Sequence, residues 1–190
     1  MTAFLLDVNV LVALAWPGHE AHERVQVWFA RNSHLGWATC PFTESAFVRI
    51  VSNPAFSAHA VSPQDALRGL TISLKHPAHR FWAAEISFGD AVRRFEGRLV
   101  GHQQVTDAYL LSLALHKKGR LATLNRSLSS LMDPKSVERE RVVLIRKAPE
   151  RVIESGVDGD RSLHNTYYRT LHMLGVIAGT ADSSSLRSSE

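Results

Sequence analysis

Three carboxylates stand beside apolar segments that a folded domain would bury. Asp7 directly follows the apolar run 4–6. Glu44 and Asp107 each precede apolar residues at i+3, i+4 and i+7, which places an acid on, or at the end of, the face that a helix turns toward the core. Burying an ionised carboxylate is costly unless it is paired or coordinates a metal. Three such acids from distant parts of the chain predict a shared cation, and with it an enzyme.

Each acid also has a simpler interpretation, in which it lies in the first turn of a helix. A negative charge there meets the positive end of the helix macrodipole. The pairs Thr43-Glu44 and Thr106-Asp107 look like such helix starts, with each threonine as a candidate cap. The two interpretations are compatible, because a helix N-terminus can also present a carboxylate to a ligand. The recurrence of one local arrangement at three sites favours the functional interpretation.

Other chemistries find little support in the chain. It contains neither a Gly-rich phosphate loop nor the G-x-S-x-G pattern of serine hydrolases. His19 and His22 are the pair nearest to a zinc motif, but they are three residues apart and a metalloprotease helix needs a spacing of four. The single cysteine, Cys40, excludes an internal disulfide and a paired-cysteine zinc site. The acids remain the best candidates, and an all-oxygen ligand set prefers a hard cation such as Mg²⁺ or Mn²⁺.

Composition limits the protein class without identifying its chemistry. A length of 190 residues with 45% hydrophobic residues predicts one globular domain and a short appendage. The net charge of +4 permits a polyanionic partner but does not require one. The apolar N-terminal run 3–16 contains Asp7 and Asn9, follows no basic residue and is too short to span a bilayer. We therefore expect a cytoplasmic protein that does not enter a membrane.

Predicted strands and helices alternate along the chain. Strands are expected at 3–6, 35–39, 79–82, 120–124 and 142–145. Helices are expected at 9–15, 19–32, 43–52, 63–74, 87–95 and 105–118, the last of them stopped by Gly119. Such alternation predicts an α/β fold with a mainly parallel central sheet. Because ligands gather beyond the carboxyl ends of parallel strands, Asp7 and Asn125 are both expected at that edge.

Residues 147–190 differ in composition from residues 1–146, and we expect them to form a separate C-terminal extension. The extension is charged at its start and serine-rich at 183–190, while apolar residues at 167–177 have near-helical spacing. A docked helix, a partner-binding segment and a tail that is partly helical or disordered are all compatible with this pattern. We expect about the last ten residues to be mobile.

Four segments resemble PIN-domain ribonucleases, and among them the VapC-type toxins of bacterial toxin–antitoxin systems. They are FLLDVNVL at 4–11, CPFTE at 40–44, GHQQVTDAYL at 101–110 and GRLATLN at 119–125, in the order of that family. The resemblance covers roughly residues 1–146. It implies a three-layer α/β/α domain that hydrolyses RNA phosphodiester bonds with Mg²⁺ or Mn²⁺. It also implies a homodimer, and a cognate antitoxin that covers the active site.

The resemblance assigns roles to particular residues of the chain. Asp7 and Asp107 would hold the metal, and Glu44 would complete the acidic cluster, directly or through water. Asn9 would be a polar neighbour of Asp7, with capping of the first helix as its alternative. Thr123 would either orient groups of the site or merely end a strand.

The chain departs from the family at Asn125, where a fourth acid is usual. An asparagine oxygen can still face a metal or its water, but it brings no negative charge. We therefore expect one bound metal and reduced activity. Two alternatives follow: a catalytically weakened PIN-like module that binds RNA or protein, or a metal-dependent phosphoesterase with another substrate.

Basic residues near the acidic edge are candidates for holding RNA. They are Arg49, Arg80 and Arg126. Each also has a simpler interpretation as a solvated charge.

Overall fold

The computed structural model of this chain describes residues 2–133 and 135–147. Its five strands form one sheet in the order β3-β2-β1-β4-β5, and all four neighbouring pairs are parallel. The strands are β1 (Phe4–Leu6), β2 (Trp37–Thr39), β3 (His79–Phe81), β4 (Arg120–Thr123) and β5 (Val142–Leu144). The predicted α/β class and parallel sheet are therefore confirmed.

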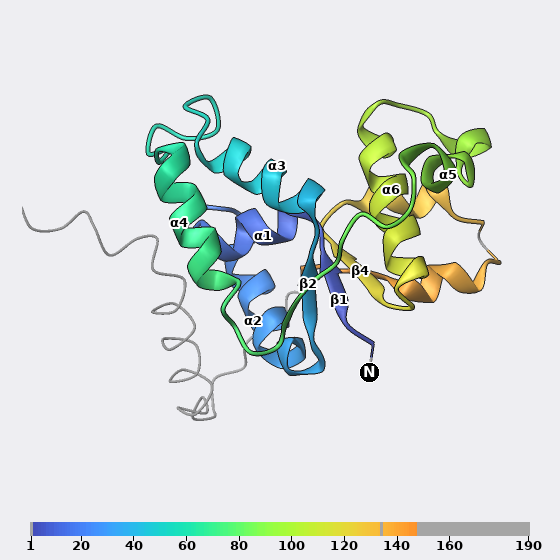
Figure 1. Cartoon of the computed structure of the whole chain (residues 1–190), viewed down its shortest axis with the longest axis horizontal. Helices are drawn as coiled ribbons and strands as arrows, with labels where there is room; N and C mark the ends of the chain where they lie inside the picture. The colour runs from blue at the N-terminus through green and yellow to red at the C-terminus, as the bar shows by residue number, and fades with distance from the viewer. Residues whose placement is uncertain (1, 134, 148–190) are drawn as a thin grey trace, which may run out of the picture.

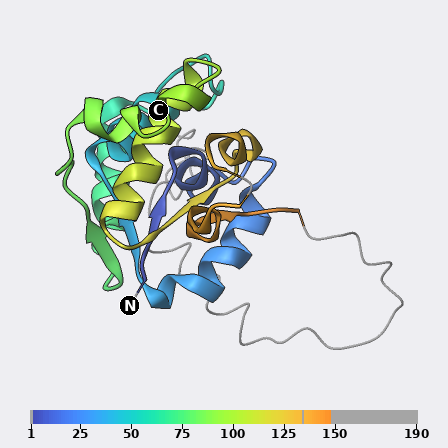
Figure 2. The ribbon, with the colours of Figure 1, turned by 90° about the vertical axis from the view of Figure 1, so that its right-hand side faces the viewer.

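Helices cover both faces of the sheet, which gives a three-layer α/β/α arrangement. α1 to α4 lie on one side of the sheet, and α5 and α6 lie on the other (Figure 1). Figure 2 views the molecule from the side of α5 and α6. The α-helices are α1 (Val8–Ala15), α2 (His22–Asn32), α3 (Pro41–Val51), α4 (Pro63–Ser73), α5 (Phe88–Arg93) and α6 (Gln103–His116). Short 3₁₀ turns are η1 (Ser33–Leu35), η2 (Glu96–Arg98), η3 (Arg126–Leu131) and η4 (Val137–Arg141).

The two-residue alternation of the strands divides the core into two clusters. Leu5 and Leu121 pack with buried residues of α6, whereas Phe4, Leu6 and Ala122 pack with buried residues of α1 to α4. Successive side chains of a strand point to opposite faces of a sheet, and both faces here are covered by helices. The central strand β1 is therefore apolar at every position, up to the edge where Asp7 follows it.

Helix α3 begins earlier than the sequence predicted. Pro41 occupies its first turn, and Cys40 is the N-cap. The hydroxyl of Thr43 accepts a hydrogen bond from the Cys40 backbone N–H at 3.0 Å. The expectation of Thr43 as the cap was therefore wrong, because proline is favoured at the first helical position and moves the start two residues upstream. Glu44 nevertheless lies in the first turn of α3.

Helix α6 also begins earlier than predicted. Its first residue is Gln103, so Asp107 lies beyond the first turn and Thr106 is not a cap. The first-turn interpretation of Asp107 was therefore wrong. Asp7 does occupy the N-cap position of α1, but its side chain makes no capping hydrogen bond. Asp107 is thus away from the N-terminus of its helix, whereas Asp7 lies at the N-terminus of α1 without capping it.

The end of α6 follows a different rule from the one expected. Lys118, and not Gly119, adopts the positive φ (53°) at the end of the helix. A Cβ on Gly119 would lie 2.9 Å from the Ala3 carbonyl oxygen and would collide with the ring of Trp82. Glycine is therefore needed here because α6 turns directly into β4 against β1, where no side chain fits.

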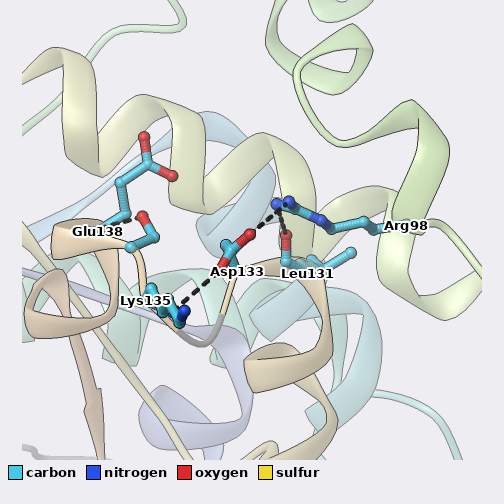
Figure 3. A network of polar contacts seen from close by, with 6 residues as sticks. Arg98, Leu131, Asp133, Lys135 and Glu138 are labelled. Carbon is cyan, nitrogen blue, oxygen red and sulfur yellow. Dashed lines mark hydrogen bonds and ion pairs between the residues drawn. The ribbon is translucent and has the colours of Figure 1, made fainter.

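An exposed polar network joins η2 to the segment after η3 (Figure 3). The guanidinium of Arg98 lies 3.4 Å from Asp133 and donates to the Leu131 carbonyl at 3.5 Å. Asp133 also accepts the backbone N–H of Lys135 at 2.9 Å. These contacts tie the chain after β4 to the α5–α6 side of the molecule.

The extension predicted at 147–190 falls almost wholly on 148–190, so the predicted helix at 167–177 and the mobile end lie outside the described residues. Among the helices within 2–133 and 135–147, none combines the length and the apolar character needed to cross a bilayer.

Candidate active site

The parallel pairing of β1 with β4 assembles the first half of the site. Leu6 is in register with Ala122, so the next residues, Asp7 and Thr123, lie side by side at the carboxyl edge of the sheet. The backbone N–H of Asp7 donates to the Ala122 carbonyl at 3.0 Å, which carries the pairing one step beyond the strand. Asn125 follows β4 by two residues. The predicted meeting of Asp7 and Asn125 at this edge is therefore supported by the topology.

Asp7 is only 4% exposed, and its carboxylate accepts several hydrogen bonds from neighbouring side chains. The Thr123 hydroxyl donates to Asp7 Oδ2 at 2.6 Å, and Asn9 Nδ2 donates to the same oxygen at 2.7 Å. Asn9 Oδ1 accepts the Leu124 backbone N–H at 3.0 Å. Asn9 therefore ties Asp7 to the end of β4 and does not cap α1. Thr123 orients the carboxylate as well as ending a strand.

Asp107 enters from α6 and is paired with Asn125. Asn125 Nδ2 donates to Asp107 Oδ2 at 2.8 Å. The Asn125 amide oxygen accepts the backbone N–H of Ser127 at 3.0 Å and its hydroxyl at 2.8 Å. A backbone N–H can only donate, so it fixes the orientation of the amide. Asn125 therefore serves Asp107 as a donor, and its oxygen is already used by Ser127.

The two carboxylates make an electrostatically unfavourable pair. Burial raises the pKa of Asp7, against hydrogen bonds from Thr123 and Asn9 that lower it. Burial also raises the pKa of Asp107 to about 6, with a further contribution from the negative charge of Asp7 and an opposing one from the Asn125 amide. No ion pair within the described ranges involves either acid. A bound cation would remove this repulsion.

Glu44 stands apart from this pair and has its own partners. It is half-buried at the start of α3, and its Oε1 accepts the Thr39 hydroxyl at 2.5 Å. In the part of the chain that the structure describes, no three or more His, Cys, Asp or Glu side chains are grouped to hold one metal ion. The three acids thus do not form one ligand set. Asp7 and Asp107 remain as candidate ligands, and Mg²⁺ commonly takes one or two carboxylates and keeps several waters.

Sequence reasoning missed two polar residues beside Glu44. The Thr39 hydroxyl lies 2.8 Å from His79 Nε2 as well as contacting Glu44. Thr39 had a readable signal, because it ends a predicted strand at the edge where ligands gather. His79 had none, since its position depends on how β3 pairs with β2, which no local pattern reports.

The candidate RNA-binding arginines are exposed but do not share one location. Arg126 directly follows Asn125, and Arg49 lies on α3, five residues after Glu44. A Cβ placed on Gly36 would lie 3.7 Å from Arg80 Cζ. Because Gly36 precedes β2, this puts the Arg80 guanidinium at the opposite end of the sheet from Asp7. The structure therefore does not bring Arg80 to the acidic edge.

Comparison with known proteins places this arrangement in a family. No family model matches the chain. Ribonuclease VapC38 of Mycobacterium tuberculosis is 45% identical over 127 residues, which span 67% of this chain and 88% of the relative. Ribonuclease VapC39 of the same organism is 39% identical over 129 residues, or 68% and 92% of the two chains. Ribonuclease VapC44 is 36% identical over 140 residues, or 74% and 98%. With this similarity along nearly the full length of these relatives, the chain belongs to the VapC-type family of PIN-domain ribonucleases.

Proposed function

We propose that the protein is a Mg²⁺- or Mn²⁺-dependent endoribonuclease that acts as the toxin of a toxin–antitoxin pair. The observation that carries the proposal is the pair Asp7 and Asp107, two buried and mutually repelling carboxylates at the carboxyl edge of a parallel sheet. Protein folding alone does not favour such a pair, because it lowers stability at neutral pH. A divalent cation would make it favourable, and the relatives named as ribonucleases supply the reaction class.

The residues around the pair would prepare it for the cation. Asp7 and Asp107 would supply the carboxylate ligands, and the hydrogen bonds from Thr123, Asn9 and Asn125 would fix their rotamers. When bound, Mg²⁺ or Mn²⁺ would neutralise the site toward an anionic phosphodiester, polarise the phosphoryl group and lower the pKa of a bound water. With only two carboxylates and an asparagine whose oxygen is engaged, the site is suited to a single cation.

Glu44 would act on the water and not on the cation. Its carboxylate lies in the first turn of α3, at the same sheet edge as Asp7. From there it would orient the attacking water or accept its proton. Hydrolysis by water does not use the ribose 2′-hydroxyl as a nucleophile, so selectivity for RNA would come from binding.

Arg126 is the strongest candidate for a phosphate contact, because it is exposed and directly follows Asn125. Arg49 is a second candidate on α3. Replacing Arg126 with Gln should weaken RNA binding and reduce its salt dependence. The matched control is Arg80→Gln, which removes the same charge from the other end of the sheet and should leave both unchanged.

A cognate antitoxin and a second copy of the chain are the proposed protein partners, on the basis of family membership. Co-expression of the chain with the product of a neighbouring reading frame, followed by affinity purification and light scattering, tests both. Recovery of a one-chain monomer that binds no co-expressed protein would contradict them.

The decisive experiment is cleavage of a structured RNA pool by the full chain with Mg²⁺, Mn²⁺ or EDTA. Asp7→Asn and Asp107→Asn keep the shape of each side chain and remove its charge. Asp65→Asn is the matched control, since Asp65 is an exposed acid on α4 that pairs with Arg68. We expect metal-dependent cleavage that falls by about 10³-fold or more in both site variants and persists in the control.

Three other outcomes would replace the proposal. Cleavage that survives both site substitutions would show that these acids are not the catalytic centre. Hydrolysis of small phosphate esters without RNA cleavage would identify a phosphoesterase. Metal-independent RNA or protein binding by a folded wild type without turnover would identify a weakened module, as the missing acid at Asn125 allows.

A further inference from the structure

A continuous line of hydrogen bonds runs from the edge strand β3 to Glu44. Thr39 ends β2 and is fully buried. Its hydroxyl donates to Glu44 Oε1 at 2.5 Å and lies 2.8 Å from His79 Nε2. The single hydroxyl proton goes to Glu44, and the role of His79 Nε2 toward the hydroxyl oxygen depends on the tautomer of the imidazole. The line therefore runs from the imidazole through the hydroxyl to the carboxylate.

The two residues behind Glu44 are themselves rigidly placed. Thr39 lies within the β2–β3 pairing, in register with Phe81, so its backbone cannot shift independently. The His79 ring packs against the Trp37 indole, with ring centroids 4.6 Å apart. Trp37 is 5% exposed, and its Nε1 donates to His76 Nδ1 at 3.2 Å. The imidazole is thus held on one side by an aromatic residue that cannot turn.

This rigidity contrasts with the freedom that Glu44 would otherwise have. A glutamate on the first turn of a helix has three rotatable side-chain bonds and is here only half-buried. One short hydrogen bond to a buried hydroxyl selects a single rotamer from that set. A group that orients a water must be fixed to within a fraction of an ångström, and supporting hydrogen bonds provide that precision.

We propose that Thr39 and His79 are positioning residues for this reaction, which hold the Glu44 carboxylate in the orientation needed to act on the attacking water. The proposal rests on the proposed ribonuclease function and adds to it a role for the β2–β3 side of the sheet, away from the metal ligands. Neither residue touches the substrate. Both act only through Glu44.

The test is a double-mutant cycle on RNA cleavage with Thr39→Val and Glu44→Gln. Valine matches threonine in shape and lacks the hydroxyl, while Thr39→Ser keeps it. We expect Thr39→Val to lower kcat by about 10- to 100-fold with KM within about twofold. Thr39→Ser should restore most of kcat. In the Glu44→Gln background, Thr39→Val should change kcat by less than about twofold, because the residue has nothing left to position.

A spectroscopic readout makes the proposal testable without turnover. The ¹⁵N and ¹H resonances of the His79 ring report its tautomer and its contact with the Thr39 hydroxyl, and they should shift in both Thr39→Val and Glu44→Gln. The matched control Glu96→Gln changes an exposed acid on the other side of the sheet and should leave them unchanged. Replacing His79 with Leu should lower kcat in the same direction as Thr39→Val, and His79→Gln should retain part of it.

The outcomes separate this inference from the function on which it rests. Equal loss from Thr39→Val in both backgrounds would show a merely structural threonine and overturn the inference, while leaving the ribonuclease intact. Wild-type kcat in Thr39→Val would do the same. Full activity in Glu44→Gln would remove Glu44 from the proposed mechanism. If no RNA is cleaved, unchanged His79 resonances in Glu44→Gln would overturn the hydrogen-bonded line itself.

Discussion

Two polar clusters of this molecule use acids in opposite ways. In the network of Figure 3, Asp133 faces Arg98, and these side chains are 51% and 45% exposed. Glu138 nearby faces Arg94. At the carboxyl edge of the sheet, Asp7 is only 4% exposed and has hydroxyl and amide partners but no cationic one among the described residues.

The difference separates a cluster that serves the fold from one that, under the proposed function, serves a ligand. An exposed ion pair typically contributes only about 0 to 1 kcal/mol to the free energy of unfolding. A buried pair of like charges lowers stability, and a protein that needed only polar contacts there would gain from amides. Under the proposed function, the partner of the site acids is a cation, and the following predictions test that difference.

Among variants that leave both site acids in place, the largest effect is expected from Thr123→Val. The change keeps the shape of the side chain and removes the hydroxyl that donates to Asp7 and accepts the Asn125 backbone N–H at 3.0 Å. Loss of such a supporting group typically weakens metal binding by about 10- to 100-fold. Calorimetric titration with Mn²⁺ measures it, and Thr123→Ser should bind nearly as the wild type does. Unchanged affinity in the valine variant would mean that Asp7 needs no orientation.

Asn125→Asp should act in the opposite direction. It adds the charge that the family usually has and replaces the amide donor to Asp107. Mn²⁺ affinity near pH 7.5 should rise by about tenfold, since one further carboxylate faces the cation. The matched control is Asn53→Asp, which adds the same charge at an exposed turn whose Oδ1 accepts the Ala55 N–H and would still do so. Equal affinity and rate in Asn125→Asp would contradict a site limited by charge.

Asp107→Asn should stabilise the metal-free protein at neutral pH. Burial raises the pKa of Asp107 to about 6 in the folded protein, whereas its ordinary pKa of 3.8 applies when the chain is unfolded. The wild type therefore loses stability as pH rises from about 4 to about 6, and the variant lacks the Asp107 contribution to this loss. A shift of this size corresponds to at most about 3 kcal/mol, which solvent near the carboxylate reduces to roughly 1–2 kcal/mol.

Urea unfolding with EDTA at pH 7.5 and pH 4 checks the sign of that effect. The variant should be more stable than the wild type at pH 7.5, and the difference should vanish at pH 4. With saturating Mn²⁺ at pH 7.5 the order should reverse, because only the wild type keeps both ligands. A variant that is less stable than wild type in EDTA at neutral pH would contradict the inference that Asp7 and Asp107 destabilise the metal-free protein.

The sequence predicted the strands and their edge because those signals are local. The apolar run before Asp7 and the segment before Asn125 were recognisable as buried strands, and parallel strands place their carboxyl ends together. The burial of Asp107 followed from helical spacing and that of Asp7 from the apolar run before it, whereas Glu44, with the same spacing as Asp107, is only half-buried. What failed were helix starts, since Pro41 and Gln103 extend α3 and α6 beyond the apolar pattern that was used.

The grouping of the acids was harder to predict than their burial. A periodic pattern reports which face of a helix is inward but not the distance between two helices. Asp107 therefore lies close enough to Asp7 for the charge of Asp7 to raise its pKa. Glu44 instead contacts Thr39, which in turn contacts His79, on the other face of the same edge. The Thr39–His79 contact depends on β2–β3 register across about forty residues of chain, and no local signal encodes it.

The smallest effect is expected from Arg98→Ala, which removes the exposed ion pair to Asp133 and the contact with the Leu131 carbonyl. Because both charges are largely solvated, the free energy of unfolding should fall by less than about 1 kcal/mol, and by less still in high salt. RNA cleavage should stay at the wild-type level, with Asp133→Asn as the reciprocal variant.

Leu131 ends η3, which begins one residue after Asn125. A clear loss of cleavage in Arg98→Ala at unchanged stability would therefore mean that this network positions Asn125 through η3, and the separation between a structural cluster and a functional one would no longer hold.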